Sequence, residues 1–238
     1  RLLFCILYSV FCILFFTGCS IKQKASSLHL RSDNLQVLSY VRELKPINTF
    51  KGVGSLEIIS GGLVHTSRVV LAAKSPHFFR IEFLNPLNQP SAVIVNNGQG
   101  YQFYYSGKIY KGTALPGYFP LQDLQQVPLY IIGSSDIPHE KIDGIRDDED
   151  LHAVIISLYY DEGSYHKVLF NPKEYTIIKR EVYDRDDNNI VTMVFSEHIE
   201  INGTKFPMLV DIKTDSLNVN IRYTKVEVNG DIDVFLFY

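Results

Sequence analysis

Histidine and cysteine are the residue types in this chain that most readily bind metals or act as nucleophiles. The seven histidines are scattered, and no two of them stand four residues apart, as a zinc-binding pair on one helical face would. All three cysteines lie at or before position 19, so no later cysteine can complete a zinc site. The Gly-x-Ser-x-Gly, Walker and dinucleotide-binding patterns are also absent from the sequence. These observations favour neither an enzyme nor a protein that carries a metal or organic cofactor.

The acidic run at 147–150 is a dense cluster of possible oxygen ligands. Its acids are sequential, whereas a calcium loop places its ligands at alternate positions, so we expect a solvated loop there. The net charge of −3 provides no basic field for nucleic acid. With 21% charged and 46% hydrophobic residues, the composition is typical of a globular domain.

Residues 1–18 have the pattern of a secretory signal. One arginine precedes an apolar run that ends in Thr17-Gly18. The run is about 15 residues long, whereas a membrane-spanning helix needs about 20. The end of this segment, Phe16-Thr17-Gly18-Cys19, resembles the bacterial lipobox, in which the cysteine sulfur receives a diacylglycerol and the chain is cleaved just before it. The resemblance implies that Cys19 is the lipidation site.

Two alternatives to lipidation remain open, an ordinary signal peptide and an anchor helix with an incidental cysteine. Lipidation is favoured because cleavage would leave Cys19 with no other thiol to pair with in the exported chain. Residues 19–31 then form the lipidated cysteine and a polar, flexible tether. Residues 32–238 form one domain, in which no segment approaches a membrane span.

Hydrophobic periodicity predicts a mainly β domain with two helices. Leu35, Leu38, Val41 and Leu44 mark one helical face, and Pro46 ends that helix. From Phe50 to Val228 the period is mostly two, with Gly and Asn turns every 8 to 12 residues. The exception is 120–133, which has the pattern of a mid-chain helix. We expect an antiparallel sheet of about ten or eleven strands that curls into an unclosed barrel, with both helices covering its hydrophobic face. The pair Gly52 and Gly54 favours a bulge or a close helix approach over phosphate binding.

A loop of this sheet carries a family resemblance. The run Arg80-Ile81-Glu82-Phe83-Leu84-Asn85-Pro86-Leu87-Asn88-Gln89-Pro90 resembles the strand and Asn-Pro-Leu-Gly loop of LolB, the outer-membrane receptor for lipoproteins, with Asn88 in place of the family's loop glycine. The order of motifs agrees with that family, because Gly52-Val53-Gly54 precedes the loop and the Pro120-Leu121-Gln122-Asp123-Leu124 and Ile131-Ile132-Gly133 segments follow it. The resemblance covers roughly residues 33–230.

The resemblance implies both a fold and a role. The fold is an unclosed antiparallel barrel around a hydrophobic cavity, with helices as a lid. The role is to take the acyl chains of lipoproteins from a soluble periplasmic carrier of the LolA type and to insert the lipoproteins into the outer membrane, without a cofactor. Ser20 favours a lipid-anchored position at the periplasmic face of the outer membrane, because the Asp that commonly signals inner-membrane retention is absent. The alternative is a structural or assembly lipoprotein of the cell envelope that acts through protein–protein contacts.

Two groups of residues are candidates for that role. In the matching loop, Asn85, Pro86 and Leu87 are expected to form a stiff turn whose leucine tip inserts into a membrane. The alternative is that Leu87 folds back over the barrel rim. The second group has inward-facing apolar side chains that would contact acyl chains, or simply pack as a core, in a register uncertain by one residue. Its members are Leu56, Ile58, Phe79, Ile81, Phe83, Val93, Val95, Phe103, Leu121, Leu124, Ile155 and Val194.

Replacing Cys19 with Ala should abolish labelling of the chain by radioactive palmitate, because the sulfur that accepts the diacylglycerol is removed. The variant should remain as a soluble or an unprocessed chain, because it lacks the acyl chains that make a stable anchor. Cys12→Ala is the matched control and should remain labelled. Undiminished labelling of the Cys19 variant would contradict the lipobox interpretation.

Overall fold

The computed structural model describes residues 32–75, 77–112, 131–132, 137–148, 150–160 and 163–238. One helix, α2 (Ser32–Glu43), precedes the strands, and two short 3-10 helices, η2 (His139–Lys141) and η3 (Val234–Phe237), occur later. The strands are β1 (Thr49–Ser60), β2 (Leu63–Lys74), β3 (Phe78–Leu84), β4 (Pro90–Asn97), β5 (Tyr101–Tyr105), β6 (Lys108–Gly112), β7 (Ile142–Asp148), β8 (Ala153–Tyr159), β9 (Tyr165–Asn171), β10 (Thr176–Tyr183), β11 (Asn189–Ile201), β12 (Thr204–Lys213) and β13 (Leu217–Val228). No helix within these ranges has both the length and the apolar character to cross a membrane.

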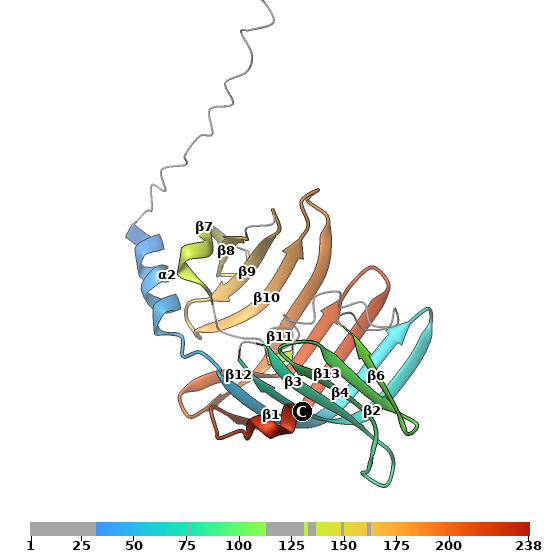
Figure 1. Ribbon diagram of the computed structural model, residues 1–238. Coiled ribbons are helices and arrows are strands. Elements are labelled where there is room, and N and C mark those ends of the chain that lie inside the picture. The colour runs from blue at the N-terminus through green and yellow to red at the C-terminus, as the bar shows by residue number, and fades with distance from the viewer. Residues whose placement is uncertain (1–31, 76, 113–130, 133–136, 149, 161–162) are drawn as a thin grey trace, which may run out of the picture.

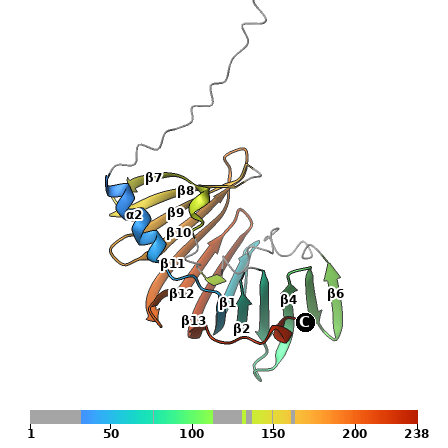
Figure 2. The ribbon, with the colours of Figure 1, turned by 60° about the vertical axis from the view of Figure 1, so that its left-hand side comes forward.

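All thirteen strands form one antiparallel sheet in the order β6-β5-β4-β3-β2-β1-β13-β12-β11-β10-β9-β8-β7. The chain starts in the middle of the sheet, runs outward to β6, and then returns from β7 at the far edge to β13 beside β1. Figures 1 and 2 show that the sheet curls strongly and that β6 and β7 stay apart, with α2 beside the β7–β10 half. The expected unclosed antiparallel barrel is therefore confirmed, as is the N-terminal helix.

The strand count is larger than expected, thirteen instead of ten or eleven. Strand β7 lies where we expected a solvated loop, and Asp147 and Asp148 belong to it. β7 is an edge strand with exposed charged positions, so it lacks the alternation of apolar and polar residues that marks a half-buried strand. The predicted mid-chain helix at 120–133 falls outside the described residues except at Ile131 and Ile132, which are helical and buried.

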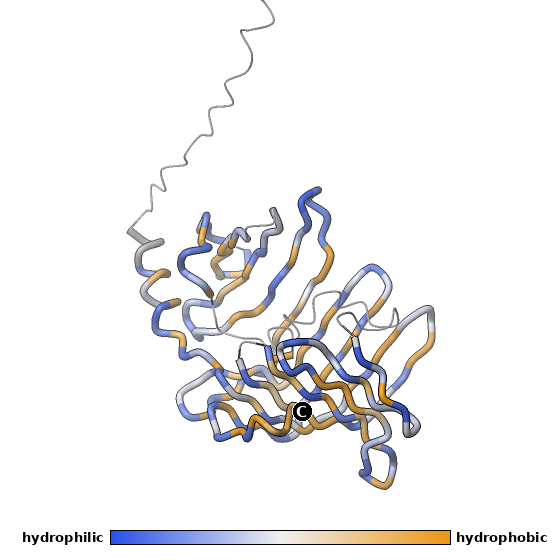
Figure 3. The backbone as a smooth tube through the Cα atoms, viewed as in Figure 1, coloured by the Kyte–Doolittle hydropathy of each residue, from blue (hydrophilic) through white to orange (hydrophobic). Residues whose placement is uncertain are grey.

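The main core lies on the concave face of the sheet. An aromatic cluster fills it beneath the central strands, where the Phe50 and Phe206 rings stack at 5.1 Å and Tyr223 meets both edge-on at 5.4 Å. The Tyr223 hydroxyl donates to the carbonyl of Ile131 at 2.7 Å, which satisfies a polar group that is otherwise buried. From α2, Val37 packs into the same core. Figure 3 shows the hydrophobic stretches following the strands while most turns are hydrophilic.

A second, smaller core lies on the convex face and corrects part of the predicted register. Val93 and Val95 pack there against Ala72 and Phe237, the latter from η3. The expectation that both valines face the acyl-chain cavity is therefore wrong. The reason is that β4 is apolar at four successive positions, from Ala92 to Val95, so its pattern does not distinguish the faces. Pairing decides the register, because Ile94, opposite Ile81 of β3, takes the concave side.

The same one-residue error affects two more strands. Ile155 was expected to face inward, but its neighbours Val154 and Ile156 belong to the main core instead. Val194 likewise points away from the core that contains Met193. Both strands carry runs of successive apolar residues, and again the pairing with their neighbours sets the face.

The glycine pair of β1 marks a close approach to β13. The expected bulge is present, since the register between these strands shifts between Val53 and Gly54. A Cβ atom on Gly54 would lie 2.3 Å from the backbone oxygen of Arg222, well inside any tolerable contact. At this position only glycine lets the two strands pair without displacement.

Gly54→Ala should lower the free energy of unfolding by about 1–3 kcal/mol, because backbone rather than a flexible side chain must move. The midpoint of urea unfolding measures this change. Gly144→Ala in β7 is the matched control, since a Cβ atom there meets nothing within 4 Å. Equal unfolding midpoints for the two variants would contradict the close approach.

Candidate functional site

Apolar side chains on the concave face range from buried to partly buried toward one end of the strands. Six of the predicted inward residues lie on this face and belong to the main core or pack against it: Leu56, Ile58, Phe79, Ile81, Phe83 and Phe103. Leu56, Phe79 and Ile81 are buried, whereas Ile58, Phe83 and Phe103 are only partly buried. Within β1 and β3, exposure rises toward the β1–β2 turn and the β3–β4 loop. The concave surface is therefore closed at its base and more open at the hairpin ends. Leu121 and Leu124 fall outside the described residues.

The β3–β4 loop is held by its own hydrogen bonds. The side-chain oxygen of Asn85 accepts from the backbone amides of Leu87 at 2.9 Å and Gln89 at 3.0 Å. The Asn88 amide donates to the Asn85 carbonyl at 2.9 Å and thereby closes the turn. Asn88 has φ of +59°, a left-handed conformation that glycine and asparagine adopt most readily. This explains how asparagine stands where the LolB pattern has glycine.

Leu87 projects from this loop into solvent. Its side chain is 78% exposed, so it does not fold back over the barrel rim. Figures 1 and 2 show the β3–β4 loop extending beyond the rest of the sheet. The Asn85 and Asn88 bonds hold the turn in this shape, and Leu87 takes part in them through its backbone amide. The loop thus presents an apolar tip on a rigid support.

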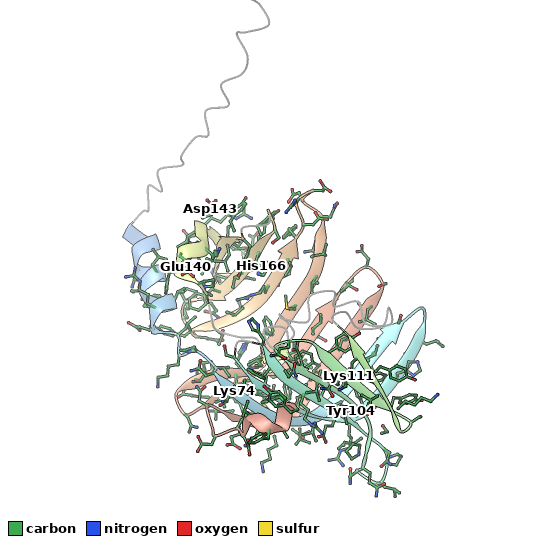
Figure 4. The ribbon with its side chains drawn as sticks, in the orientation of Figure 1. Lys74, Tyr104, Lys111, Glu140, Asp143 and His166 are labelled. Carbon is green, nitrogen blue, oxygen red and sulfur yellow. The ribbon has the colours of Figure 1, made fainter. Side chains whose placement is uncertain are left out.

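Two polar side chains are buried on the concave face of the other half of the sheet. Arg180 of β10 is 1% exposed and His166 of β9 is 2% exposed. His166 pairs with Val182, and its ring lies 4.4 Å from that of Tyr160 (Figure 4 labels His166). From the sequence, none of the histidines was expected to have a role. The alternation of His166 with the buried Val168 and Phe170 was the signal that it faces inward.

The environment of His166 keeps it neutral. Burial, with a smaller effect from the positive charge of Arg180, lowers the pKa of His166 from 6.5 to about 3. Its Nδ1 atom has no hydrogen-bond partner among the described residues. Within those residues, no three His, Cys, Asp or Glu side chains are grouped to hold a metal. The buried part of β9 and β10 therefore places a cation and a neutral imidazole among apolar side chains of the main core.

Comparison with known proteins defines the fold. No family model and no curated protein matches the sequence. Among solved structures, a domain assigned to outer-membrane lipoprotein sorting in Vibrio parahaemolyticus superposes with a TM-score of 0.62 at 10% identity, over 85% of this chain and 94% of that one. A LolA superfamily protein from Nitrosomonas europaea gives a TM-score of 0.58 at 11% identity, over 86% and 96% of the two chains. A DUF1329 family protein from Desulfovibrio piger gives 0.59 at 13% identity, over 86% and 95%.

The chain has the LolA/LolB-type fold. The likeness covers 85–86% of this chain and 94–96% of these three structures. The resemblance proposed from the Asn85-Pro86-Leu87 loop is thus confirmed at the level of fold. At 10–13% identity the likeness carries no residue-level role, and the roles of the concave face and of Leu87 stay proposals.

The neutral state of His166 predicts acid sensitivity. In the unfolded chain His166 takes up a proton near pH 6.5, whereas in the folded chain it does so only near pH 3. The contribution of neutral His166 to the free energy of unfolding is therefore fully present above pH 6.5 and is lost as the pH falls toward 3. Between pH 7 and pH 4 the loss should be on the order of 3 kcal/mol. His166→Leu should flatten this dependence when the free energy of unfolding is measured against pH. The same substitution at the exposed His139 is the control, and an unchanged slope in His166→Leu would refute the assignment.

Proposed function

We propose that this chain is a lipid-anchored protein at the periplasmic face of the outer membrane. It binds the acyl chains of lipoproteins on its concave face and helps to insert them into that membrane. The observation that carries the proposal is the apolar concave surface that runs from buried Leu56 and Ile81 to partly exposed Ile58 and Phe83, next to an exposed Leu87. Leu56, Ile58, Phe79, Ile81, Phe83 and Phe103 would contact the acyl chains, and Leu121 and Leu124 are proposed to contribute to the same cavity.

The physical basis is burial of hydrocarbon. An acyl chain gains about 0.8 kcal/mol for each methylene removed from water, so a shielded apolar surface can hold it during transfer. No bond is made or broken in this process, and neither a cofactor nor an enzymatic step is required. Cys19, with its diacylglycerol, would hold the domain at the outer membrane, and a carrier of the LolA type would supply the cargo. The Vibrio parahaemolyticus domain of the same fold is itself assigned to lipoprotein sorting, which supports the proposal.

One observation favours a second role. The Phe50, Phe206 and Tyr223 cluster packs the base of the concave face solidly, as in a domain that needs no ligand. A structural or assembly lipoprotein that acts through protein contacts would have such a core. The two roles differ at the open end of the face, where only the first requires acyl chains to reach Ile58 and Phe83.

The test of function is photo-crosslinking in cells, followed by delivery to vesicles. A benzoylphenylalanine in place of Ile58 should crosslink to lipoproteins through their acyl chains. The same residue in place of Val194, on the convex face, is the matched control and should not. Depletion of the protein should leave lipoproteins in the periplasm. Crosslinking to an unlipidated protein from position 58 would instead support the assembly role.

Leu87→Glu should separate acceptance of cargo from its release. The side chain is exposed, so the free energy of unfolding should change by no more than about 0.5 kcal/mol. Crosslinking from position 58 should persist, because the substitution lies outside the concave face. Delivery to liposomes should fail, since insertion of a leucine tip gains up to roughly 1.5–3 kcal/mol and a carboxylate gains none. Wild-type delivery by a stable Leu87→Glu protein would eliminate the role of this residue.

A further inference from the structure

The β5–β6 hairpin carries exposed apolar side chains beside the β3–β4 loop. Tyr105 is 54% exposed, Ile109 56% and Tyr110 45%. In a meander of antiparallel strands every second turn lies at the same end, so the β5–β6 turn and the β3–β4 loop are neighbours. They share a recess of about 310 Å³, which is lined on one side by residues 90–93 and on the other by residues 104–109. We call these two tips together the hairpin corner, which contains Leu87, Tyr105, Lys108, Ile109, Tyr110 and Lys111.

The hairpin corner is continuous with the concave face. The ring of Phe103, which packs against the main core, lies 5.9 Å from Tyr105 and 6.1 Å from Tyr110. An apolar path therefore leads from the partly buried Phe103 to side chains that are about half exposed. Tyrosine suits the end of such a path, because its ring is apolar while its hydroxyl stays in water, as at membrane interfaces.

The charge of the hairpin corner is one-sided. No acidic residue occurs from Leu84 to Gly112, whereas Lys108 and Lys111 are both exposed on β6. Lys111 and Tyr104 come from adjacent strands of this hairpin (Figure 4). Arg68 adds a third cation, since its guanidinium donates to the side-chain oxygen of Asn88 in the neighbouring loop. This local excess of positive charge contrasts with the net charge of −3 of the whole chain.

The other half of the sheet has the opposite charge at the same end of its strands. The β10–β11 turn contains Asp184, Asp186 and Asp187 around a single Arg185. An anionic surface would therefore attract one half of this end and repel the other. Lysines on an edge strand such as β6 also discourage pairing with another chain, but that role does not require an exposed Ile109.

From these observations we infer that the hairpin corner docks on the surface of a bilayer that contains anionic phospholipid, with Ile109 and Tyr110 entering the interface beside Leu87. Lys108 and Lys111 pair with lipid phosphates. The inference rests on the proposed function for the presence of a membrane, and it adds a second contact element and a lipid preference. Docking at this corner places the open end of the concave face against the bilayer, where cargo leaves.

The test uses the full chain reconstituted in vesicles, with an environment-sensitive fluorophore on Ile109→Cys and bromolipids as quenchers. Vesicles of phosphatidylcholine alone are compared with vesicles that also contain phosphatidylglycerol. Quenching at position 109 is expected only with phosphatidylglycerol. Leu151→Cys is the matched control, because Leu151 is 59% exposed but lies in the β7–β8 turn at the opposite end of the strands. It should remain unquenched in both vesicles.

Charge reversal tests the lipid preference. Lys108→Glu with Lys111→Glu should lower the ratio of quenched to unquenched fluorophore by at least about fivefold for each cation reversed, because the attraction of each lysine is lost and the new carboxylate is repelled. Lys173→Glu with Lys225→Glu makes the same change of net charge at exposed sites elsewhere and should have no effect. Equal quenching in both kinds of vesicle, equal quenching at positions 109 and 151, no quenching at all, or a chain that does not float with the vesicles would each overturn the inference.

Failure of the inference and failure of the proposed function give different results. If quenching at position 109 behaves as expected but lipoproteins do not crosslink at position 58, the membrane contact stands and the cargo role is wrong. If lipoproteins crosslink and are delivered while position 109 stays unquenched in both vesicles, the cargo role stands and the hairpin corner is not the docking surface.

Discussion

Strand β1 pairs with β13 along nearly its whole length, from Phe50 opposite Val228 to Ser60 opposite Leu217. This pairing joins the two halves of the described sheet, because β2 to β6 extend from one side of it and β7 to β12 from the other. All the other pairs in the described sheet join strands that follow one another in sequence, whereas the β1–β13 pair joins opposite ends of the domain. The Gly54 approach, the bulge beside it and the stacked Phe50 and Phe206 rings all lie at or next to this seam. Its register fixes which side chains of both halves face inward.

From this seam the strands divide the concave face into a packed base and an open end. At the base, aromatic rings pack against one another and the buried Tyr223 hydroxyl is paired with the carbonyl of Ile131. Toward the hairpin tips the same strands carry partly exposed Ile58, Phe83 and Phe103. A domain stabilised at one end can expose apolar surface at the other without losing its fold, since the packed base supplies the burial that stability needs. This separation is what the proposed binding of acyl chains requires of a single sheet.

Periodicity predicted most of the strands and the loop, because alternation with a period of two is a direct consequence of one-sided burial. It could not assign faces where apolar residues are successive, and Val93, Val95, Ile155 and Val194 were misplaced for that reason. The convex core under η3 was the missing information, since it makes the outer face of β4 apolar as well. β7 was missed because an edge strand needs few apolar residues. The buried Arg180 was missed because arginine is rarely buried.

Residues 85–88 were the most informative segment of the sequence, and the structure shows why. A proline and two asparagines specify a turn mainly through local hydrogen bonds, to which Arg68 of the neighbouring β2 adds one at Asn88. Leu87 therefore had no packing role to fill, and its exposure follows from the turn. The exposure of the β5–β6 hairpin could not be predicted, because in sequence Tyr105 and Ile109 look like ordinary strand residues. Only the meander, which brings that hairpin beside the loop, makes the two a single surface. Because no acidic residue occurs between Leu84 and Gly112, folding gathers the lysines of this segment into a positively charged corner of the sheet.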